Sequence, residues 1–275
     1  LFLLRLVIRG NKMKANELLL FLSNKFEGDW QKIFNFIKAK ESPPTNEEIQ
    51  DVINRTKFDY ISLTSNDYPE LFKQVLNTPP FIVYYQGDIK LLNKEFKKLT
   101  VIGSRISSLY ARNLTDKLVK ELPNDVVIIS GLAKGIDSCG IKAALYSNKK
   151  VIAVLGNGIG RCYPHENEQI YKDILENGGL ILSEYPYGTE PKQENFRWRN
   201  RIIAALGDSI FVAEAKYNSG TRITVNYGLN YGKSVGCLPF RCDEESYCNL
   251  LIKQGAEMIE NINDLKSLLN IPIKI

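Results

Sequence analysis

The chain has few of the side chains that form metal sites or disulfide frameworks. Its 275 residues include one histidine, His165, and an odd number of cysteines, none of them in a CxxC pair. This usage does not indicate a disulfide framework or a zinc site built from thiolates and imidazoles. We therefore expect five reduced thiols in a cytoplasmic protein, with no metal ion and no other cofactor. The cysteines are Cys139, Cys162, Cys237, Cys242 and Cys248.

A hydrophobic run long enough to cross a membrane is also lacking. The apolar opening, residues 1–8, is interrupted by Arg5 and followed by Arg9 and two lysines. A spanning helix needs about 20 apolar residues, and a secretory signal needs a cleavage site of small residues. We expect neither, and no membrane partner. The opening run would be either a strand or a translated stretch upstream of a start at Met13.

Composition and charge allow many functions. Hydrophobic residues make up 44% and charged residues 24%, which is the balance of an ordinary globular protein. The length suits one large α/β domain with a small appendage. A net charge of +5 and a pI near 8.8 permit an anionic partner, but many proteins with no role in nucleic-acid binding are equally basic.

The N-terminal part of the sequence has a helical pattern. Apolar residues recur at helical spacing between residues 15 and 40, until Pro43 and Pro44 interrupt the pattern, and a second helical stretch covers residues 46–55. A polar, proline-rich segment follows. We therefore predict a small helical domain over residues 1–65 and a second domain over residues 66–275.

The second domain alternates short β-branched runs with longer amphipathic stretches. The predicted strands are Leu99–Ile102, Val126–Ser130, Val151–Leu155, Leu180–Ser183, Ser209–Ala213 and Ser234–Leu238. The predicted helices are Ser108–Leu122, Ile136–Ser147, Glu166–Asn177, Arg199–Leu206 and Thr221–Tyr231. Continuous apolar strands separated by crossover helices predict a Rossmann-like, doubly wound α/β fold with a mostly parallel sheet buried on both faces.

Four turns that follow strands have a similar composition. Each combines glycine with a hydroxyl, a cation or both: Gly103–Arg105, Ser130–Asp137, Gly156–Arg161 and Asn218–Thr221. Ligands of such sheets bind outside the carboxyl ends of the strands, where glycine lets the backbone approach an anion and a helix N-terminus offers N–H groups. Any one turn is also explained by the needs of a tight βα connection. Four at one edge would hold a chain of phosphates.

The long loop after the fourth strand, residues 184–196, leads into three closely spaced arginines. Cations at the start of a helix oppose the helix dipole, which favours anions there. Nearby aromatic residues add the stacking surface that unpaired bases use beside a basic groove. In the alternative interpretation the rings belong to the core and the arginines pair with Glu184 or Glu214. The arginines are Arg197, Arg199 and Arg201, and the rings are Tyr185, Tyr187, Phe196 and Trp198.

Catalytic motifs are weak. There is no GxxxxGK[ST] loop, and Lys134 is followed by glycine instead of a hydroxyl. The glycines spaced by two after the third strand are a weak dinucleotide signal, and a nucleophile–histidine dyad would have to use His165. We interpret Asp137 as support for its helix start and Glu214 as a strand-end partner for an arginine. We therefore expect no enzyme.

Taken in order, these loops resemble the DNA-processing protein A family, also called DprA or Smf. The similarity covers about residues 60–258. The segments that carry it are Asp67–Pro69, Pro79–Asp88, Gly103–Arg105, Ser130–Asp137, Val154–Gly156, Tyr163–Pro164, Ser183–Pro186, Phe196–Ile203, Glu214–Ala215, Ser219–Gly220 and Leu251–Ala256.

The resemblance implies a homodimer that binds single-stranded DNA cooperatively and loads the recombinase RecA onto it during natural transformation. It assigns phosphate contacts to Arg105, Ser130 and Lys134, and places Phe196 with its neighbours at the same pocket. Together with the glycine-rich turns, the expected DNA contacts are Gly103, Ser104, Arg105, Ser130, Gly131, Lys134, Gly135, Lys192, Gln193, Phe196, Arg199, Asn200, Arg201, Ser219 and Gly220.

The chain departs from the family pattern at three places. Cys139-Gly140 stands where relatives commonly have Ala-His, Pro239-Phe240 where they often have Pro-Gly, and the sequence stops at Ile275 without the winged-helix tail of many members. Two other functions compete with the resemblance. One is a nucleotide-processing enzyme of the Rossmann-like phosphoribohydrolase type, whose Pro-Gly-Gly-x-Gly-Thr-x-x-Glu loop is missing here. The other is an adaptor whose basic loops meet an acidic protein.

Overall fold

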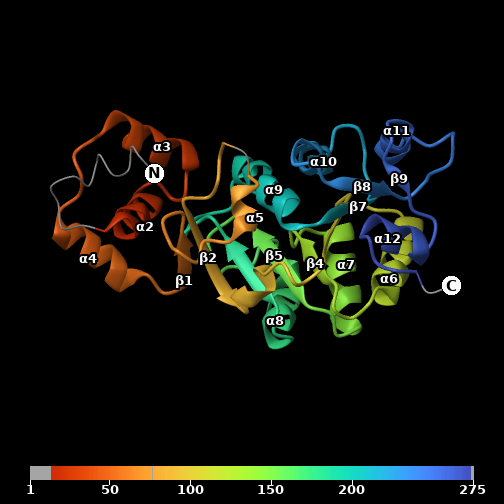
Figure 1. The fold of residues 1–275 in the computed structure, drawn as a ribbon, viewed down its shortest axis with the longest axis horizontal. Coiled ribbons are helices and arrows are strands. Elements are labelled where there is room, and N and C mark those ends of the chain that lie inside the picture. Colours follow the sequence, from red (N-terminus) through yellow and green to blue (C-terminus); the bar gives the residue numbers. More distant parts are fainter. Residues whose placement is uncertain (1–13, 76, 274–275) are drawn as a thin grey trace.

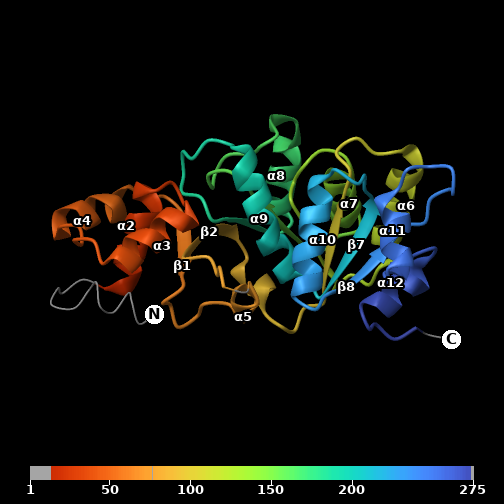
Figure 2. The same ribbon diagram turned by 90° about the horizontal axis from the view of Figure 1, so that it is seen from above.

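The computed structural model describes residues 14–75 and 77–273, so the opening run of residues 1–8 lies outside the described part. Within it, nine strands form one sheet with helices on both faces (Figure 1). The strand order is β1-β2-β6-β5-β4-β3-β7-β8-β9. The N-terminal helices lie at one end of the elongated molecule and the last elements at the other (Figure 2).

The N-terminal helices are α2 (Ala15–Lys25), α3 (Trp30–Ala39) and α4 (Asn46–Arg55). The Asp29 side chain accepts a hydrogen bond from the Lys32 backbone at the start of α3, and Thr45 forms a capping box at the start of α4. The predicted helical stretches are therefore confirmed.

These helices share a core with the sheet. Asn24 donates to the Tyr84 hydroxyl at 3.2 Å, that hydroxyl donates to Ser23 at 3.0 Å, and the Trp30 indole donates to the Pro79 carbonyl at 2.8 Å. The sheet itself begins at Asp59, before the boundary predicted at residue 65, and that boundary stays a prediction. The two antiparallel strands at this end are β1 (Asp59–Ser62) and β2 (Ile82–Gly87), and β2 also pairs with β6.

The rest of the sheet is parallel, which confirms the predicted fold class. Every predicted strand is present, and each is buried along most of its length. The strands are β3 (Lys98–Gly103), β4 (Val127–Ser130), β5 (Val151–Leu155), β6 (Leu180–Ser183), β7 (Ser209–Glu214), β8 (Ser234–Cys237) and β9 (Glu257–Met258).

The helices cover the two faces of the sheet in two sets (Figure 1). One face carries α6 (Leu109–Glu121), α7 (Ile136–Tyr146), α8 (Glu168–Glu176) and α12 (Ile262–Leu268). The other carries α5 (Glu70–Lys73), α9 (Gln193–Leu206), α10 (Gly220–Asn230) and α11 (Tyr247–Lys253). Short 3₁₀ turns are η1 (Ile89–Leu92) and η2 (His165–Asn167).

Helix α9 begins at Gln193, six residues before the predicted start at Arg199. The arginines at 197, 199 and 201 therefore lie beyond its first turn. Because the dipole effect is confined to that turn, the predicted opposition of arginines and helix dipole is wrong.

The winding of the chain changes direction between β3 and β7. From β3 the chain proceeds through β4, β5 and β6 toward one edge, whereas β7, β8 and β9 lie on the other side of β3. Ligands of open α/β sheets bind at such a switch point, outside the carboxyl ends of the strands. The loops after β3, β4, β5 and β7 are therefore the place to look for a site.

No helix in residues 14–75 or 77–273 is long and apolar enough to cross a membrane. No cluster of three or more histidine, cysteine, aspartate or glutamate side chains with the geometry of a metal site occurs in that same part. All five cysteines carry free thiols, and Cys237 and Cys248 are buried.

Candidate nucleic-acid interface

The turns after β3, β4 and β7 are hydrogen-bonded to one another. The Ser104 backbone N–H donates to the Glu214 carbonyl at 2.7 Å, and the Ile136 N–H donates to the Ser104 carbonyl at 3.1 Å. Gly135 has a φ of +77°, and a Cβ there would overlap the Ser104 carbonyl oxygen. Glycine is required at this position for both reasons. The three turns therefore form one continuous backbone surface at the switch point.

Phe196 lies at the centre of the side chains around this surface. Its ring centroid is 6.0 Å from the Arg105 guanidinium carbon, 5.8 Å from that of Arg199 and 5.3 Å from the Tyr163 ring. Gly156, after β5, lies against the same ring, because a Cβ there would overlap it. Arg105 is exposed and Tyr163 is 45% exposed, while Phe196 is half-buried. The structure thus brings together the predicted residues Arg105, Phe196 and Arg199.

Two exposed lysines in the surrounding loops are paired with carboxylates. Lys134 adjoins Gly135 and pairs with Glu166, and this hydrogen bond lowers the pKa of the Glu166 carboxyl. Lys192 precedes α9, and its Nζ lies 2.8 Å from a carboxylate oxygen of Glu27, in the turn between α2 and α3. The hydrogen bond to Glu27 raises the pKa of Lys192. Both pairs are solvated, so an incoming phosphate competes with the carboxylate at low cost. Gln193, the first residue of α9, is also exposed.

Arg199 is buried and holds the β4 turn in shape. Its guanidinium donates to the Gly131 carbonyl at 3.0 Å and to the Val154 carbonyl. Burial lowers the pKa of Arg199 to about 10 while Asp137 opposes the shift, so the side chain stays charged near neutral pH. Asp137, in the first turn of α7, accepts hydrogen bonds from two N–H groups of the preceding turn, that of Gly131 at 3.1 Å and that of Ala133 at 3.3 Å. Burial raises the pKa of Asp137, and Arg199 opposes that shift.

The side chains of Arg201 and Ser130, two of the predicted contacts, are withdrawn from solvent and bonded within the protein. Arg201 makes two hydrogen bonds to Glu184, at 2.8 and 2.6 Å, and one to the Thr78 carbonyl at 3.2 Å. The alternative pairing with Glu184 is therefore the one observed. The Ser130 hydroxyl donates to the Val101 carbonyl at 2.7 Å inside the sheet. Neither side chain is exposed to a ligand in this arrangement, since both have a relative exposure of 0%.

Of the four rings predicted as a stacking surface, only Phe196 lies beside Arg105. Trp198 packs at 6.0 Å from Trp30, in the seam with the N-terminal helices, and Tyr185 is buried with its hydroxyl donating to the Asn195 carbonyl. Tyr187 is exposed but lies beside Phe58. The ring that does accompany Phe196 is Tyr163, which was not among the predicted contacts. Its only signal was its place in the family pattern, because its contact with Phe196 exists only in the folded chain.

The remaining predicted residues lie at the start of α10 and in the β3 turn. Asn200 donates to the Gly220 carbonyl at 3.3 Å, which links α9 to α10. The buried Ser219 hydroxyl has no hydrogen-bond partner among the described residues. Glu214 accepts from the backbone and hydroxyl of Ser108, at 2.8 and 2.7 Å, so its predicted pairing with an arginine is wrong. It secures the start of α6 instead.

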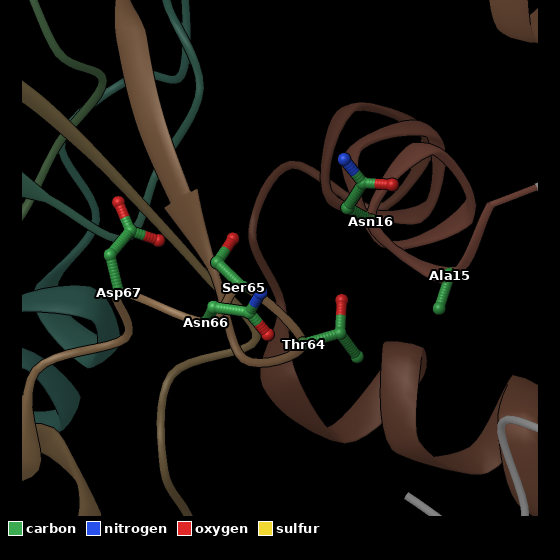
Figure 3. A pocket seen from close by; sticks show the side chains of 6 residues that line it. All are labelled: Ala15, Asn16, Thr64, Ser65, Asn66 and Asp67. Atoms are coloured by element: carbon green, nitrogen blue, oxygen red, sulfur yellow. The ribbon is translucent and has the colours of Figure 1, made fainter.

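A cavity of about 460 Å³ lies elsewhere, between the start of α2 and the turn after β1 (Figure 3). Ala15, Asn16 and residues 64–67 line it, so it has neither a cation nor an aromatic ring. Such a lining is a poor match to a nucleic-acid strand. The loops at the carboxyl ends of the parallel strands remain the candidate interface.

A doubly wound sheet whose carboxyl edge carries glycine-rich turns, exposed cations and an accessible ring defines a Rossmann-like protein of the polyanion-binding class. More specifically, the chain belongs to the family of DNA recombination-mediator protein A, whose family model matches residues 59–270. The resemblance inferred from the loop motifs is confirmed.

Individual relatives agree with this assignment. The chain is 36% identical to DNA processing protein DprA of Streptococcus pneumoniae over 211 residues, which are 76% of this chain and 73% of the relative. It is 38% identical over 207 residues to protein Smf of Synechocystis, 72% of this chain and 51% of that protein, so it spans about half of the latter's length.

Two solved structures share the fold. The X-ray structure of DprA from S. pneumoniae superposes with a TM-score of 0.73 at 30% identity, covering 95% of each chain. DprA from Helicobacter pylori superposes with a TM-score of 0.69 at 33% identity, covering 78% of this chain and 97% of the other. That second structure describes the relative's single-stranded DNA binding mode.

Proposed function

We propose that this chain binds single-stranded DNA along the carboxyl edge of its sheet and acts as a recombination mediator. The observation that carries the proposal is the position of Phe196, a partly exposed ring whose centroid lies 6.0 Å from the guanidinium carbon of Arg105 and 5.8 Å from that of Arg199. Stacking platforms beside cations are the usual means of holding unpaired bases. Family membership and the single-stranded DNA bound by the H. pylori relative support the same function.

Each group at the edge has a distinct task in this proposal. Arg105, Lys134 and Lys192 bind phosphates, while Phe196 and Tyr163 stack on bases. Backbone N–H groups at the start of α10 add neutral donors, as helix N-termini do for anions. The further contacts are Gly103, Ser104, Gly131, Gly135, Gln193, Asn200, Ser219 and Gly220. Arg199 and Arg201 are positioning residues that hold the β4 turn and α9.

We assign no catalytic step to this edge. Asp137 is engaged by two backbone N–H groups and Glu214 by Ser108, so both carboxylates already have structural partners. Through the family we further propose a homodimer that works in the cytoplasm with a RecA-type recombinase during natural transformation.

The experiment is a titration of labelled single-stranded oligonucleotides of increasing length at several salt concentrations. Each phosphate neutralised on a single strand contributes about −0.7 to the slope of log affinity against log salt. Arg105→Ala combined with Lys134→Ala should therefore weaken binding and flatten that slope by about 1.4. Lys73→Ala is the matched control, because Lys73 also pairs with an exposed carboxylate, Glu70, but lies in α5.

Three results would contradict the proposal: no binding of single-stranded DNA by the wild-type chain, a wild-type salt slope in the double variant, or competition for the chain by an acidic polypeptide as effective as that by DNA. Release of free base from nucleotides by the wild-type chain would point to the phosphoribohydrolase alternative.

A further inference from the structure

A second exposed ring with a cation lies where the sheet meets the N-terminal helices. Tyr187, in the loop between β6 and α9, is 56% exposed. The Lys57 Nζ lies 4.9 Å from its ring centroid, and the Phe58 ring lies 5.8 Å away. Lys57 and Phe58 belong to the segment between α4 and β1, so two parts of the chain build this pair. The same loop contacts the segment between α2 and α3 through the ion pair of Lys192 with Glu27.

The loop after β5 connects this pair to Phe196. At one end of the loop, Tyr163 lies 5.3 Å from the Phe196 ring. Three residues earlier, Gly160 has a φ of +82° and lies against Phe58, because a Cβ there would overlap that ring. Three peptide steps of 3.8 Å put the Cα atoms of Gly160 and Tyr163 at most about 11 Å apart. The loop after β5 therefore links the contact of Tyr163 with Phe196 to the contact of Gly160 with Phe58, the ring beside Tyr187.

Hydrogen bonds join the two loops that carry Tyr163 and Tyr187. The Gly158 N–H donates to the Thr189 carbonyl at 2.9 Å and the Ile159 N–H to the Tyr185 carbonyl at 3.1 Å, which joins the loops after β5 and β6. The buried Asn157 amide donates to the Arg161 carbonyl at 2.8 Å. These hydrogen bonds hold the backbone of the two loops in place before a ligand binds, so binding does not have to order it.

A further cation lies on the loop after β5. Arg161 is exposed and pairs with Glu190, a solvated pair that a phosphate displaces at low cost. Contacts run from Arg105 through Phe196 to Tyr163, and Lys57 contacts Tyr187, while Arg161 precedes Tyr163 by two residues on the loop after β5. Cations therefore accompany the rings along this loop, as phosphates accompany the bases of a single strand.

We propose that the DNA strand continues from Phe196 and Tyr163 past Arg161, so that a base stacks on Tyr187 and a phosphate is bound by Lys57. This inference rests on the proposed function and extends its site onto the N-terminal segment. An exposed cation over a ring is held weakly, so Lys57 leaves the ring for the phosphate and exposes that face to the base. The occupant is the same strand, a few nucleotides farther along.

The test compares short and long oligonucleotides, about 4 and about 16 residues, which bracket the site sizes of single-strand binding domains. Tyr187→Ala should weaken binding of the long oligonucleotide by about tenfold, which is the effect of losing one stacked base. The affinity for the short oligonucleotide should not change. Tyr187→Phe should retain wild-type affinity. Lys57→Gln should flatten the salt slope by about 0.7 for the long oligonucleotide only.

A matched control is available on α7. Tyr146 is 80% exposed and the Lys120 Nζ lies 4.4 Å from its ring centroid, the same kind of pair at the C-terminal end of the helix. Tyr146→Ala should leave binding of both oligonucleotides unchanged. Tyr187→Leu, which keeps an apolar contact with Phe58 but has no aromatic face, should behave like Tyr187→Ala if stacking is the cause.

The outcomes separate this inference from the proposed function. If the wild-type chain binds neither oligonucleotide, the proposed function fails. If the wild-type chain binds and Phe196→Ala weakens both lengths, but Tyr187→Ala has no effect or weakens both equally, only the continuation onto Tyr187 is overturned.

Discussion

Replacing Phe196 by alanine removes the central ring of the proposed interface and leaves every charge in place. Base–aromatic stacking contributes about 1–3 kcal/mol per base, which corresponds to roughly a 5- to 150-fold loss of affinity. The substitution also removes the ring that lies 6.0 Å from the Arg105 guanidinium carbon, so the arginine side chain is held less firmly in position to bind a phosphate. We therefore expect at least about tenfold weaker binding of a single strand. Because no cation is removed, the salt dependence of the affinity should not change.

The assay is fluorescence anisotropy of a labelled oligonucleotide at several salt concentrations, with thermal unfolding measured on the same samples. Phe196→Leu keeps most of the buried volume and separates stacking from packing. Gly156→Ala is an independent perturbation, because its methyl group would overlap the ring and displace it. We expect it to weaken binding in the same direction. Wild-type affinity in Phe196→Ala, or a loss accompanied by a changed salt slope, would refute the reasoning.

Three further predictions concern groups around the ring. Glu166→Gln should strengthen binding at low salt, because Lys134 then loses its competing carboxylate, and anisotropy would show the lower Kd. Glu184→Ala should lower the free energy of unfolding by about 3–5 kcal/mol in urea, because it leaves the Arg201 charge buried and unpaired. Gly135→Ala should cost about 1–3 kcal/mol of stability from its positive φ, and more from its overlap with the β3 turn.

Each of these has a control. Glu70→Gln removes a similar exposed partner from Lys73 and should leave the Kd unchanged. Glu184→Gln keeps the shape of the carboxylate and should destabilise less than alanine does. Gly232→Ala has a comparable φ of +71° with nothing within 4 Å of the added methyl, so it measures the backbone cost alone. Equal effects of a variant and its control would contradict the corresponding prediction.

The strands and their crossover helices were predictable because burial on both faces demands continuous apolar runs. The start of α9 was not. Its N-cap is Lys192, which makes no side-chain capping bond, so the usual signal of Ser, Thr, Asp or Asn before a helix is missing. Strands β1, β2 and β9 were also missed. β1 and β9 have only four and two residues, and β2 pairs antiparallel with both its neighbours, outside the alternation of strands and crossover helices.

Part of the site followed from the same rules. The convergence of Arg105, Phe196 and Arg199 was expected from the placement of loops at the carboxyl ends of parallel strands. The burial of Arg201 depended on a partner that sequence spacing does not identify, since Glu184 lies in another loop. For Tyr163, nothing local distinguishes a ring beside Phe196 from any exposed tyrosine.

The sheet ends in very short strands on both sides, β1 with four residues and β9 with two. An edge of that length offers few unpaired backbone groups, and Asp59 and Glu257 add charge to it. Two copies of this chain therefore have little opportunity to merge their sheets edge to edge, and a contact between copies would have to use helix and loop surfaces.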